Sequence, residues 1–232
     1  MIDVRLSQDR GMADFGWLQA KHSFSFGEYW DPKHMGFGSL RVINEDRIAA
    51  SAGFDTHGHK NMEIITYILE GALEHKDSLG SGSVLRPGDV QRMRAGRGIR
   101  HSEFNHLQDN QTHLLQIWIE PSEIGLQPGY EDRHFGDQRK NRLALIASPD
   151  ARDGSLDIHQ DVSLYASVLD EGVEVIHELV SGRKAWLQIA QGSVRLNGVD
   201  LGQGDGAAII DESKLVIKAN EPSDILLFDM AD

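Results

Sequence analysis

The sequence predicts an all-β fold, and three observations carry this prediction. The 24 glycines are scattered between short apolar runs, as expected where tight turns join many strands. Most of these runs are rich in β-branched and aromatic residues, which favour strands. Long helical periodicity is missing, so at most a short helix is expected, at residues 7–14 or 122–124.

The expected strands follow the chain in order, each next to a turn signal. Residues 64–69, for example, form an apolar run that ends at Glu70 and Gly71. The polar, turn-rich stretch 120–141 has the composition of a connection between two units. The full set of expected strands is 36–43, 64–69, 113–119, 143–146, 163–169, 186–189, 206–210 and 225–228.

The two halves of the chain resemble each other, which predicts a duplicated β-unit. Residues 67–71 are echoed by residues 187–192, and the Gly-Asp turn at 88–89 is echoed at 204–205. The alternative is that Gly-Asp turns recur by chance in any β-protein. Because a duplicated unit gives two similar folding units, we expect two domains, residues 1–130 and residues 131–232.

Composition excludes several classes of function. With no cysteine in 232 residues, disulfides, thiolate metal ligands and iron–sulfur clusters are excluded. The net charge of −13 opposes direct contact with nucleic-acid phosphates and with anionic membranes. No signal peptide or membrane-spanning run is readable, so we expect a cytoplasmic protein, and we expect it to be a monomer.

Two pairs of residues with the same spacing predict a metal site. They are His57-Gly58-His59 and His101-Ser102-Glu103, the one H-x-H and the one H-x-E in the chain. On a strand, residues two apart point to the same face. Two such strands can therefore bring three imidazoles and one carboxylate to a single ion, and these donors suit iron, copper, nickel, zinc or manganese.

The alternative for any single histidine is an ordinary core or surface residue. With 11 histidines, a chance H-x-H is expected about half a time per chain, so one pair alone is weak. The duplication adds a contrast, because the second half lacks the ligand set. Glu178 and Val180 occupy the places that match His57 and His59, and Ile217 matches His101. We therefore expect metal in the first half only.

At this point the sequence resembles a known family. Residues 53–71 resemble the first cupin motif, and residues 88–103 resemble the second motif in the form seen in pirins. Residues 22–26, 35–37 and 148–155 are similar to the bacterial pirin-like proteins. The resemblance covers essentially the whole chain. This sequence departs from the family pattern at Gly58, where the family usually has proline.

The resemblance implies a bicupin, two antiparallel jelly-roll β-barrels packed face to face, with metal in the first barrel only. It implies one divalent metal ion bound by His57, His59, His101 and Glu103. Fe(II) is the ion expected, with copper, nickel, manganese, cobalt and zinc as alternatives. In many other cupins the glutamate of the first motif is a ligand, here Glu63. Glu63 shares strand parity with the first pair, so we expect it near the site, with Glu103 as the ligand.

The resemblance also implies an activity, that of quercetin 2,3-dioxygenase. Such an enzyme opens the central ring of a flavonol with O2 and releases carbon monoxide, and Glu103 is the expected catalytic base. Phe24, Phe26 and Phe37 are candidates for an apolar entrance, although core packing explains them equally well. One alternative is a pirin-type coregulator that binds a protein partner without turnover. Another is a cupin that binds some other small molecule.

Overall fold

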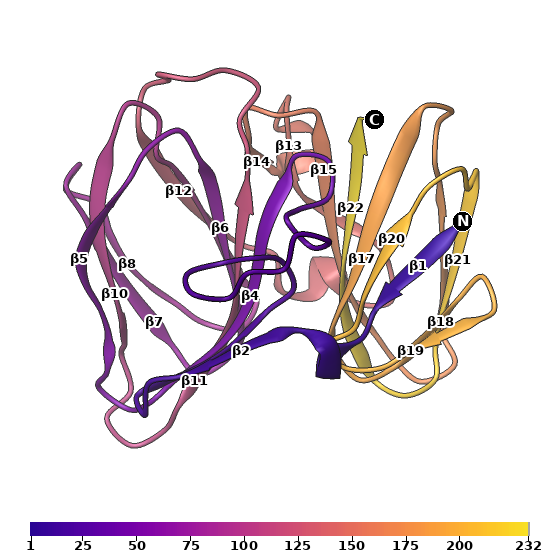
Figure 1. Cartoon of the computed structure of the whole chain (residues 1–232), viewed down its shortest axis with the longest axis horizontal. Helices are drawn as coiled ribbons and strands as arrows, with labels where there is room; N and C mark the ends of the chain where they lie inside the picture. Colours follow the sequence, from indigo (N-terminus) through magenta and orange to yellow (C-terminus); the bar gives the residue numbers. More distant parts are fainter. Residues whose placement is uncertain (232) are drawn as a thin grey trace. The chain divides into compact units, whose positions relative to one another are not determined.

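The computed structural model describes residues 1–231, and its regular structure consists of strands and three short 3-10 turns (Figure 1). The residues divide into two compact units. Residues 11–134 and 158–160 form the N-terminal barrel. Residues 1–10, 135–157 and 161–231 form the C-terminal barrel. Within the described residues, no helix is long and apolar enough to cross a membrane.

The N-terminal barrel consists of a seven-stranded and a four-stranded antiparallel sheet. The larger sheet has the order β12-β9-β6-β11-β4-β3-β2. Its strands are β2 (Gly11–Asp14), β3 (Leu18–His22), β4 (Leu40–Ile48), β6 (Glu63–Glu70), β9 (Asp89–Arg94), β11 (Thr112–Ile119) and β12 (Gly129–His134). The smaller sheet has the order β5-β10-β7-β8, with β5 (Gly53–His59), β7 (Leu73–Asp77), β8 (Gly82–Leu85) and β10 (Ile99–Asn105).

Strand burial explains where the polar residues of this barrel point. On β6 every residue from Glu63 to Leu69 is buried, which explains the continuous apolar run in the sequence. On β10 burial alternates instead, so that His101, Glu103 and Asn105 are buried between more exposed neighbours. A strand with this period has one face directed into the barrel, and on β10 that face is polar.

The C-terminal barrel repeats the same arrangement. Its larger sheet has the order β1-β20-β17-β22-β15-β13-β14 and its smaller sheet the order β16-β21-β18-β19. The larger sheet contains β1 (Ile2–Arg5), β13 (Ala144–Ser148), β14 (Leu156–Asp157), β15 (Val162–Leu169), β17 (Arg183–Gln191), β20 (Gly206–Ile209) and β22 (Ser223–Ala231). The smaller sheet contains β16 (Glu174–Glu178), β18 (Val194–Leu196), β19 (Val199–Leu201) and β21 (Lys214–Ala219).

Strand order confirms the duplicated β-unit. The run β20-β17-β22-β15 matches β9-β6-β11-β4 strand for strand, and the four-stranded sheets match in the same way. The far edges differ, because β13 pairs in parallel with β14, whereas β3 pairs antiparallel with β2. The edge position that β12 holds in the N-terminal barrel is held by β1 in the C-terminal barrel. The amino-terminal strand reaches it by antiparallel pairing of Ile2–Arg5 with β20.

Three details differ from the sequence predictions. Residues 1–10 belong to the C-terminal barrel and not to a domain spanning 1–130, because β1 pairs with β20. The expected short helix is a 3-10 turn at Ser7–Asp9, followed by β2, and two further 3-10 turns lie at Gly136–Arg139 and Arg152–Gly154. The polar stretch 120–141 contains β12, whose pairing partner β9 lies far away in sequence.

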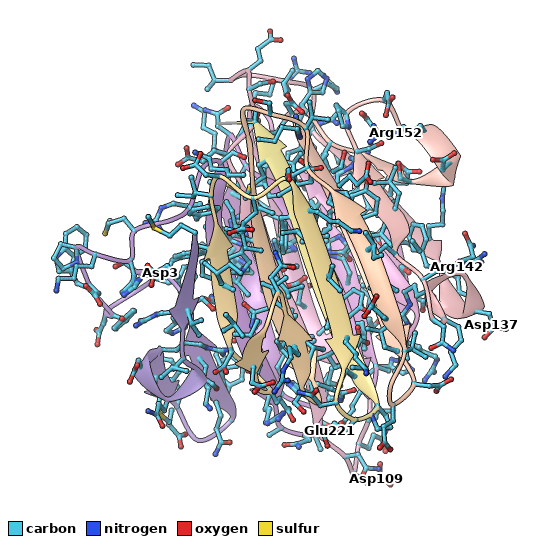
Figure 2. The ribbon with its side chains drawn as sticks, turned by 90° about the vertical axis from the view of Figure 1, so that its right-hand side faces the viewer. Asp3, Asp109, Asp137, Arg142, Arg152 and Glu221 are labelled. Carbon is cyan, nitrogen blue, oxygen red and sulfur yellow. The ribbon has the colours of Figure 1, made fainter. Side chains whose placement is uncertain are left out.

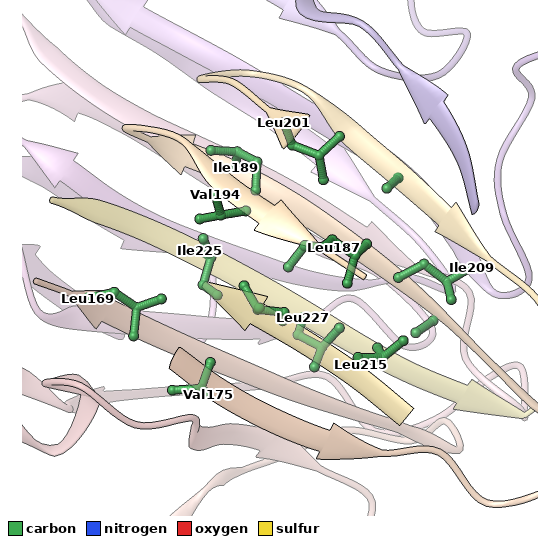
Figure 3. Close-up of a cluster of buried hydrophobic side chains, with 14 of the residues drawn as sticks. Leu169, Val175, Leu187, Ile189, Val194, Leu201, Ile209, Leu215, Ile225 and Leu227 are labelled. Atoms are coloured by element: carbon green, nitrogen blue, oxygen red, sulfur yellow. The ribbon is translucent and has the colours of Figure 1, made fainter. Parts of the chain in front are cut away.

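The interior of the C-terminal barrel is fully apolar at its centre (Figure 3). Leu187 and Ile189 alternate along β17, and Ile225 and Leu227 alternate along β22, all with no exposed surface. Charged side chains lie outside this core: Figure 2 shows Asp137 and Arg152 on the short 3-10 turns, and Glu221 on the turn between β21 and β22.

Truncation of Leu227 to alanine tests this packing. Because Leu227 is fully buried, Leu227→Ala is expected to lower the free energy of unfolding by about 2–5 kcal/mol, measured by urea denaturation. The control Val180→Ala, at a side chain that is 71% exposed, is expected to change it by less than about 0.5 kcal/mol. A loss below about 1 kcal/mol for Leu227→Ala would contradict the assigned core.

Candidate metal centre

Three of the predicted ligands meet in the four-stranded sheet of the N-terminal barrel. His57 and His59 end β5, and His101 lies on the neighbouring strand β10, directly across from His57 in the register. The spacing of two puts both β5 imidazoles on one face. The register shifts between His101 and Glu103, where β5 has one extra residue, and such a bulge re-aims side chains.

The three imidazoles converge on one point. Their ring centroids lie 4.5 Å (His57 to His101), 4.8 Å (His57 to His59) and 4.9 Å (His59 to His101) apart. One nitrogen from each ring lies within 4.8 Å of the other two. The Nε2 atoms of His57 and His101 are 3.0 Å apart. This confirms the convergence that the sequence pattern predicted.

Hydrogen bonds behind the rings fix which nitrogen faces that point. His57 donates its Nδ1 proton to the carbonyl oxygen of Asp55 at 2.8 Å. Nδ1 of His101 lies 3.4 Å from Nδ1 of His75, and Nε2 of His75 lies 3.1 Å from Oδ2 of Asp77. If Asp77 accepts the single proton of His75, then His101 donates from Nδ1. In this tautomer the Nε2 lone pairs of His57 and His101 face each other.

Sequence analysis missed His75. It lies on β7 with no exposed surface, and its ring stacks on Tyr130 of β12 with centroids 4.6 Å apart. The available signal was His75-Lys76-Asp77, which has the same spacing of two as the predicted pairs. Burial lowers the pKa of His75, which favours the neutral ring that this hydrogen-bond chain needs.

Glu103 lies beside His57, His59 and His101, which are called the triad below, and it has polar neighbours of its own. Its Oε2 accepts a hydrogen bond from Nε2 of Gln116 at 2.8 Å, and Thr66 Oγ1 lies 3.5 Å from Oε1. Oxygen and nitrogen atoms of Glu103, His75 and His101 form a second group within 4.8 Å, which shares His101 with the first. Burial raises the pKa of Glu103 to about 7, although hydrogen bonds from Gln91, Gln116 and Thr66 lower it.

Glu63 does not join the site, which corrects the expectation from strand parity. The turn after His59 separates β5 from β6, so parity does not carry over from one strand to the other. Glu63 instead accepts a hydrogen bond from Nε of Arg94 at 2.6 Å and lies 3.3 Å from the backbone nitrogen of His159. Burial raises its pKa, and Arg94 opposes that rise.

The residues present fit a divalent transition metal. Burial lowers the pKa of His59 to about 4 and that of His101 to about 2, and the neighbouring histidines lower both further. Both rings are therefore neutral near pH 7, the form that binds metal. Two lone pairs that face each other at 3.0 Å repel each other unless a proton or a cation lies between the rings. Imidazole nitrogens with a nearby carboxylate suit the divalent ions from manganese to zinc.

A cavity of about 760 Å³ opens onto this centre. Its walls combine His57, His59 and Glu103 with apolar side chains and seven further polar ones. Of the three predicted entrance residues, Phe26 lines the cavity. Phe24 is 2% exposed and belongs to the buried core, and Phe37 is not among the lining residues. The apolar lining consists of Met12, Ala13, Phe15, Leu18, Ala20, Phe26, Phe54 and Trp118.

The lowered histidine pKa values predict a pH dependence of the metal-free protein. An unfolded imidazole titrates near 6.5, whereas folded His59 titrates near 4 and His101 near 2. As the pH falls from about 6.5 to 4, the unfolded chain binds protons that the folded chain excludes, so stability is lost. His101→Gln is expected to reduce the difference in unfolding free energy between pH 7 and pH 4.5, measured by urea denaturation with chelator present.

The half-exposed His106 supplies the control for this experiment, as His106→Gln removes an imidazole on the loop after β10. This variant is expected to retain the wild-type pH difference. An unchanged pH difference in His101→Gln would show that the buried triad does not resist protonation.

Comparison with known proteins agrees with this architecture. The pirin family profile matches residues 4–119, and the quercetinase C-terminal cupin domain matches residues 145–230. The chain is 48% identical over 230 residues to quercetin 2,3-dioxygenase of Escherichia coli strain K12, covering 99% of both. The crystal structure of the bacterial pirin YhhW from Escherichia coli in complex with nickel(II) is also 48% identical, with a TM-score of 0.95 over 100% of this chain and 99% of that one. The chain therefore belongs to the pirin family, and its two barrels are cupin domains.

Proposed function

We propose that this protein is a metal-dependent dioxygenase that opens the central ring of flavonols such as quercetin with O2 and releases carbon monoxide. The observation that carries the proposal is the convergence of His57, His59 and His101 beside a cavity that His57 and His59 line. Its volume of about 760 Å³ lies within the range of sites for drug-sized ligands. The full-length similarity to a protein named quercetin 2,3-dioxygenase supports the same activity.

In this proposal, His57, His59, His101 and Glu103 hold one divalent ion, Fe(II) in the cell. When bound, the ion supplies Lewis acidity, redox capacity and open positions for substrate oxygen atoms. The nickel(II) complex of the similar bacterial pirin supports a divalent ion here. The hydrogen-bond chain from Asp77 through His75 holds the His101 ring so that its Nε2 faces Nε2 of His57.

Glu103 acts as the general base. Burial raises the pKa of this carboxyl to about 7 in the absence of a cation, and a bound cation would favour the carboxylate, the form that accepts a proton. The amide of Gln116 and the hydroxyl of Thr66 hold the carboxylate in place at the cavity wall. Glu103 therefore accepts the proton of the flavonol 3-hydroxyl, and the apolar walls exclude water from the resulting anion.

Substitution of the base tests the mechanism. At saturating Fe(II), Glu103→Gln is expected to lower quercetin consumption by about 100-fold or more, because the amide cannot accept the proton. Metal content is measured on the same samples. The control Glu120→Gln changes an exposed carboxylate after β11 and is expected to keep full activity. Full turnover by Glu103→Gln would remove Glu103 as the base.

Product analysis tests the activity itself. The wild-type protein with Fe(II) and quercetin is expected to consume O2 and to release one equivalent of carbon monoxide for each flavonol opened. No carbon monoxide with any of the divalent ions from manganese to zinc would contradict this enzyme activity, and the two alternatives would remain: a coregulator without turnover and a cupin that binds another small molecule.

The hydrogen-bond chain behind His101 predicts an effect on metal affinity. His75→Phe keeps a ring to stack on Tyr130 but removes the acceptor for the Nδ1 proton of His101. Loss of such a partner typically weakens metal binding about 10- to 100-fold. Competition with a chromogenic chelator measures the affinity for Ni(II). Wild-type affinity in His75→Phe would mean that the chain does not orient His101.

A further inference from the structure

We propose that His22, Asn44 and Asp46 form a polar subsite that binds a hydroxyl group of the ligand at a distance from its metal-chelating oxygens. The inference rests on the proposed function and extends it to the class of substrate. The preferred ligand is then a flat, neutral aromatic molecule with a chelating oxygen pair at one end and a hydrogen-bonding hydroxyl at another. This subsite is named the distal subsite below.

Strand register brings the three side chains together inside the N-terminal barrel. His22 ends β3 and pairs with Asn44 on β4, and Asp46 follows two residues later on the same face. All three line the cavity, and they are only 5%, 3% and 4% exposed. On the same face of β4 the flanking positions are Val42 and Ile48, so a polar group here is an exception.

Hydrogen-bonding capacity suits a hydroxyl group. Nδ1 of His22 and Oδ1 of Asn44 are 2.8 Å apart, which directs the amide of Asn44 with its oxygen toward the imidazole. A carboxylate accepts a hydroxyl proton, and an amide NH2 donates to a hydroxyl oxygen. Polar groups at defined positions in a cavity are the usual means by which a binding site orients its ligand.

Aromatic rings connect the distal subsite to the metal centre. The ring of His59 lies 5.0 Å from that of Trp118, Trp118 lies 5.3 Å from Phe26, and Phe26 lies 5.4 Å from His22. These four rings belong to four different segments but form one continuous series. A flat aromatic ligand can pack along them, with one end at the triad and another at the distal subsite.

Charge along the cavity limits the class of ligand further. The lining includes the carboxylates of Asp14, Glu28, Asp46 and Glu103. Among the cavity-lining residues of the described chain, none is lysine or arginine. A carboxylate, sulfate or phosphate on the distal end of the ligand would be repelled. The distal group is therefore neutral and donates a hydrogen bond, as a phenolic hydroxyl does.

Two flavonols separate the distal subsite from the metal centre. Both quercetin and 3-hydroxyflavone carry the 4-ketone and 3-hydroxyl pair that chelates metal, but only quercetin carries further hydroxyl groups. Binding of each is measured by titration calorimetry to nickel(II)-loaded protein without O2. The wild-type protein is expected to bind quercetin about tenfold more tightly, since one well-placed hydrogen bond to a charged group contributes about that factor.

Substitutions in the subsite are expected to abolish this preference selectively. Asn44→Leu and, as the more conservative change, Asp46→Asn each lower the affinity for quercetin about three- to tenfold and leave 3-hydroxyflavone within about twofold. Nickel content and the midpoint of urea unfolding are measured on each variant. Gln19→Leu is the matched control: it changes an exposed amide on the opposite face of β3 and retains the preference.

Two results would overturn the distal subsite while the proposed function stands. These are equal affinity of the wild-type protein for both flavonols, or variants that weaken both flavonols alike. A third result, no binding of either flavonol to nickel-loaded wild type, would instead contradict the proposed function, and the distal subsite with it.

Discussion

The metal centre depends on one electrostatic constraint, the approach of the Nε2 atoms of His57 and His101 to 3.0 Å. The ring protons of His57 and His101 are held on the far side, by the carbonyl of Asp55 and by the chain through His75 to Asp77. Burial keeps protons from entering between the rings, as the lowered pKa of His101 indicates. A divalent cation removes the repulsion, so the fold is organised to receive one.

The two barrels solve the same packing problem in different ways. In the C-terminal barrel the strands that correspond to β5 and β10 are β16 and β21, and they direct Val175, Leu215 and Ile217 into an apolar core. In the N-terminal barrel the buried apolar residues form smaller clusters, one that includes Ile48, Leu73 and Leu114 and another that includes Ile64 and Met93. The remaining interior holds the imidazoles and the cavity. The candidate site therefore lies in the N-terminal barrel, where polar residues and a cavity take the place of the continuous apolar core of the C-terminal barrel.

Local sequence patterns predicted much of the fold and of the metal site, and pairing between distant strands explains the features that they did not predict. The spacing of two between His57 and His59 was sufficient to predict that their imidazoles lie on one face, because strand geometry alone places such side chains together. Glu63 was expected near the site because it shares strand parity with His57 and His59. This parity does not hold, because a turn separates β5 from β6. Two other features follow from pairing between segments that are distant in the sequence. β1 belongs to the C-terminal barrel because it pairs with β20, and His22 lies beside Asn44 because β3 pairs with β4. No periodicity within either segment encodes such a register.

X-ray absorption at the nickel edge tests the central claim most directly, on protein loaded with one equivalent of Ni(II). The account predicts a first shell of nitrogen and oxygen donors with multiple scattering from three imidazoles, reduced to two in His59→Ala. A spectrum without imidazole scattering, or one that His59→Ala leaves unchanged, would contradict the claim that the triad of the N-terminal barrel binds the metal.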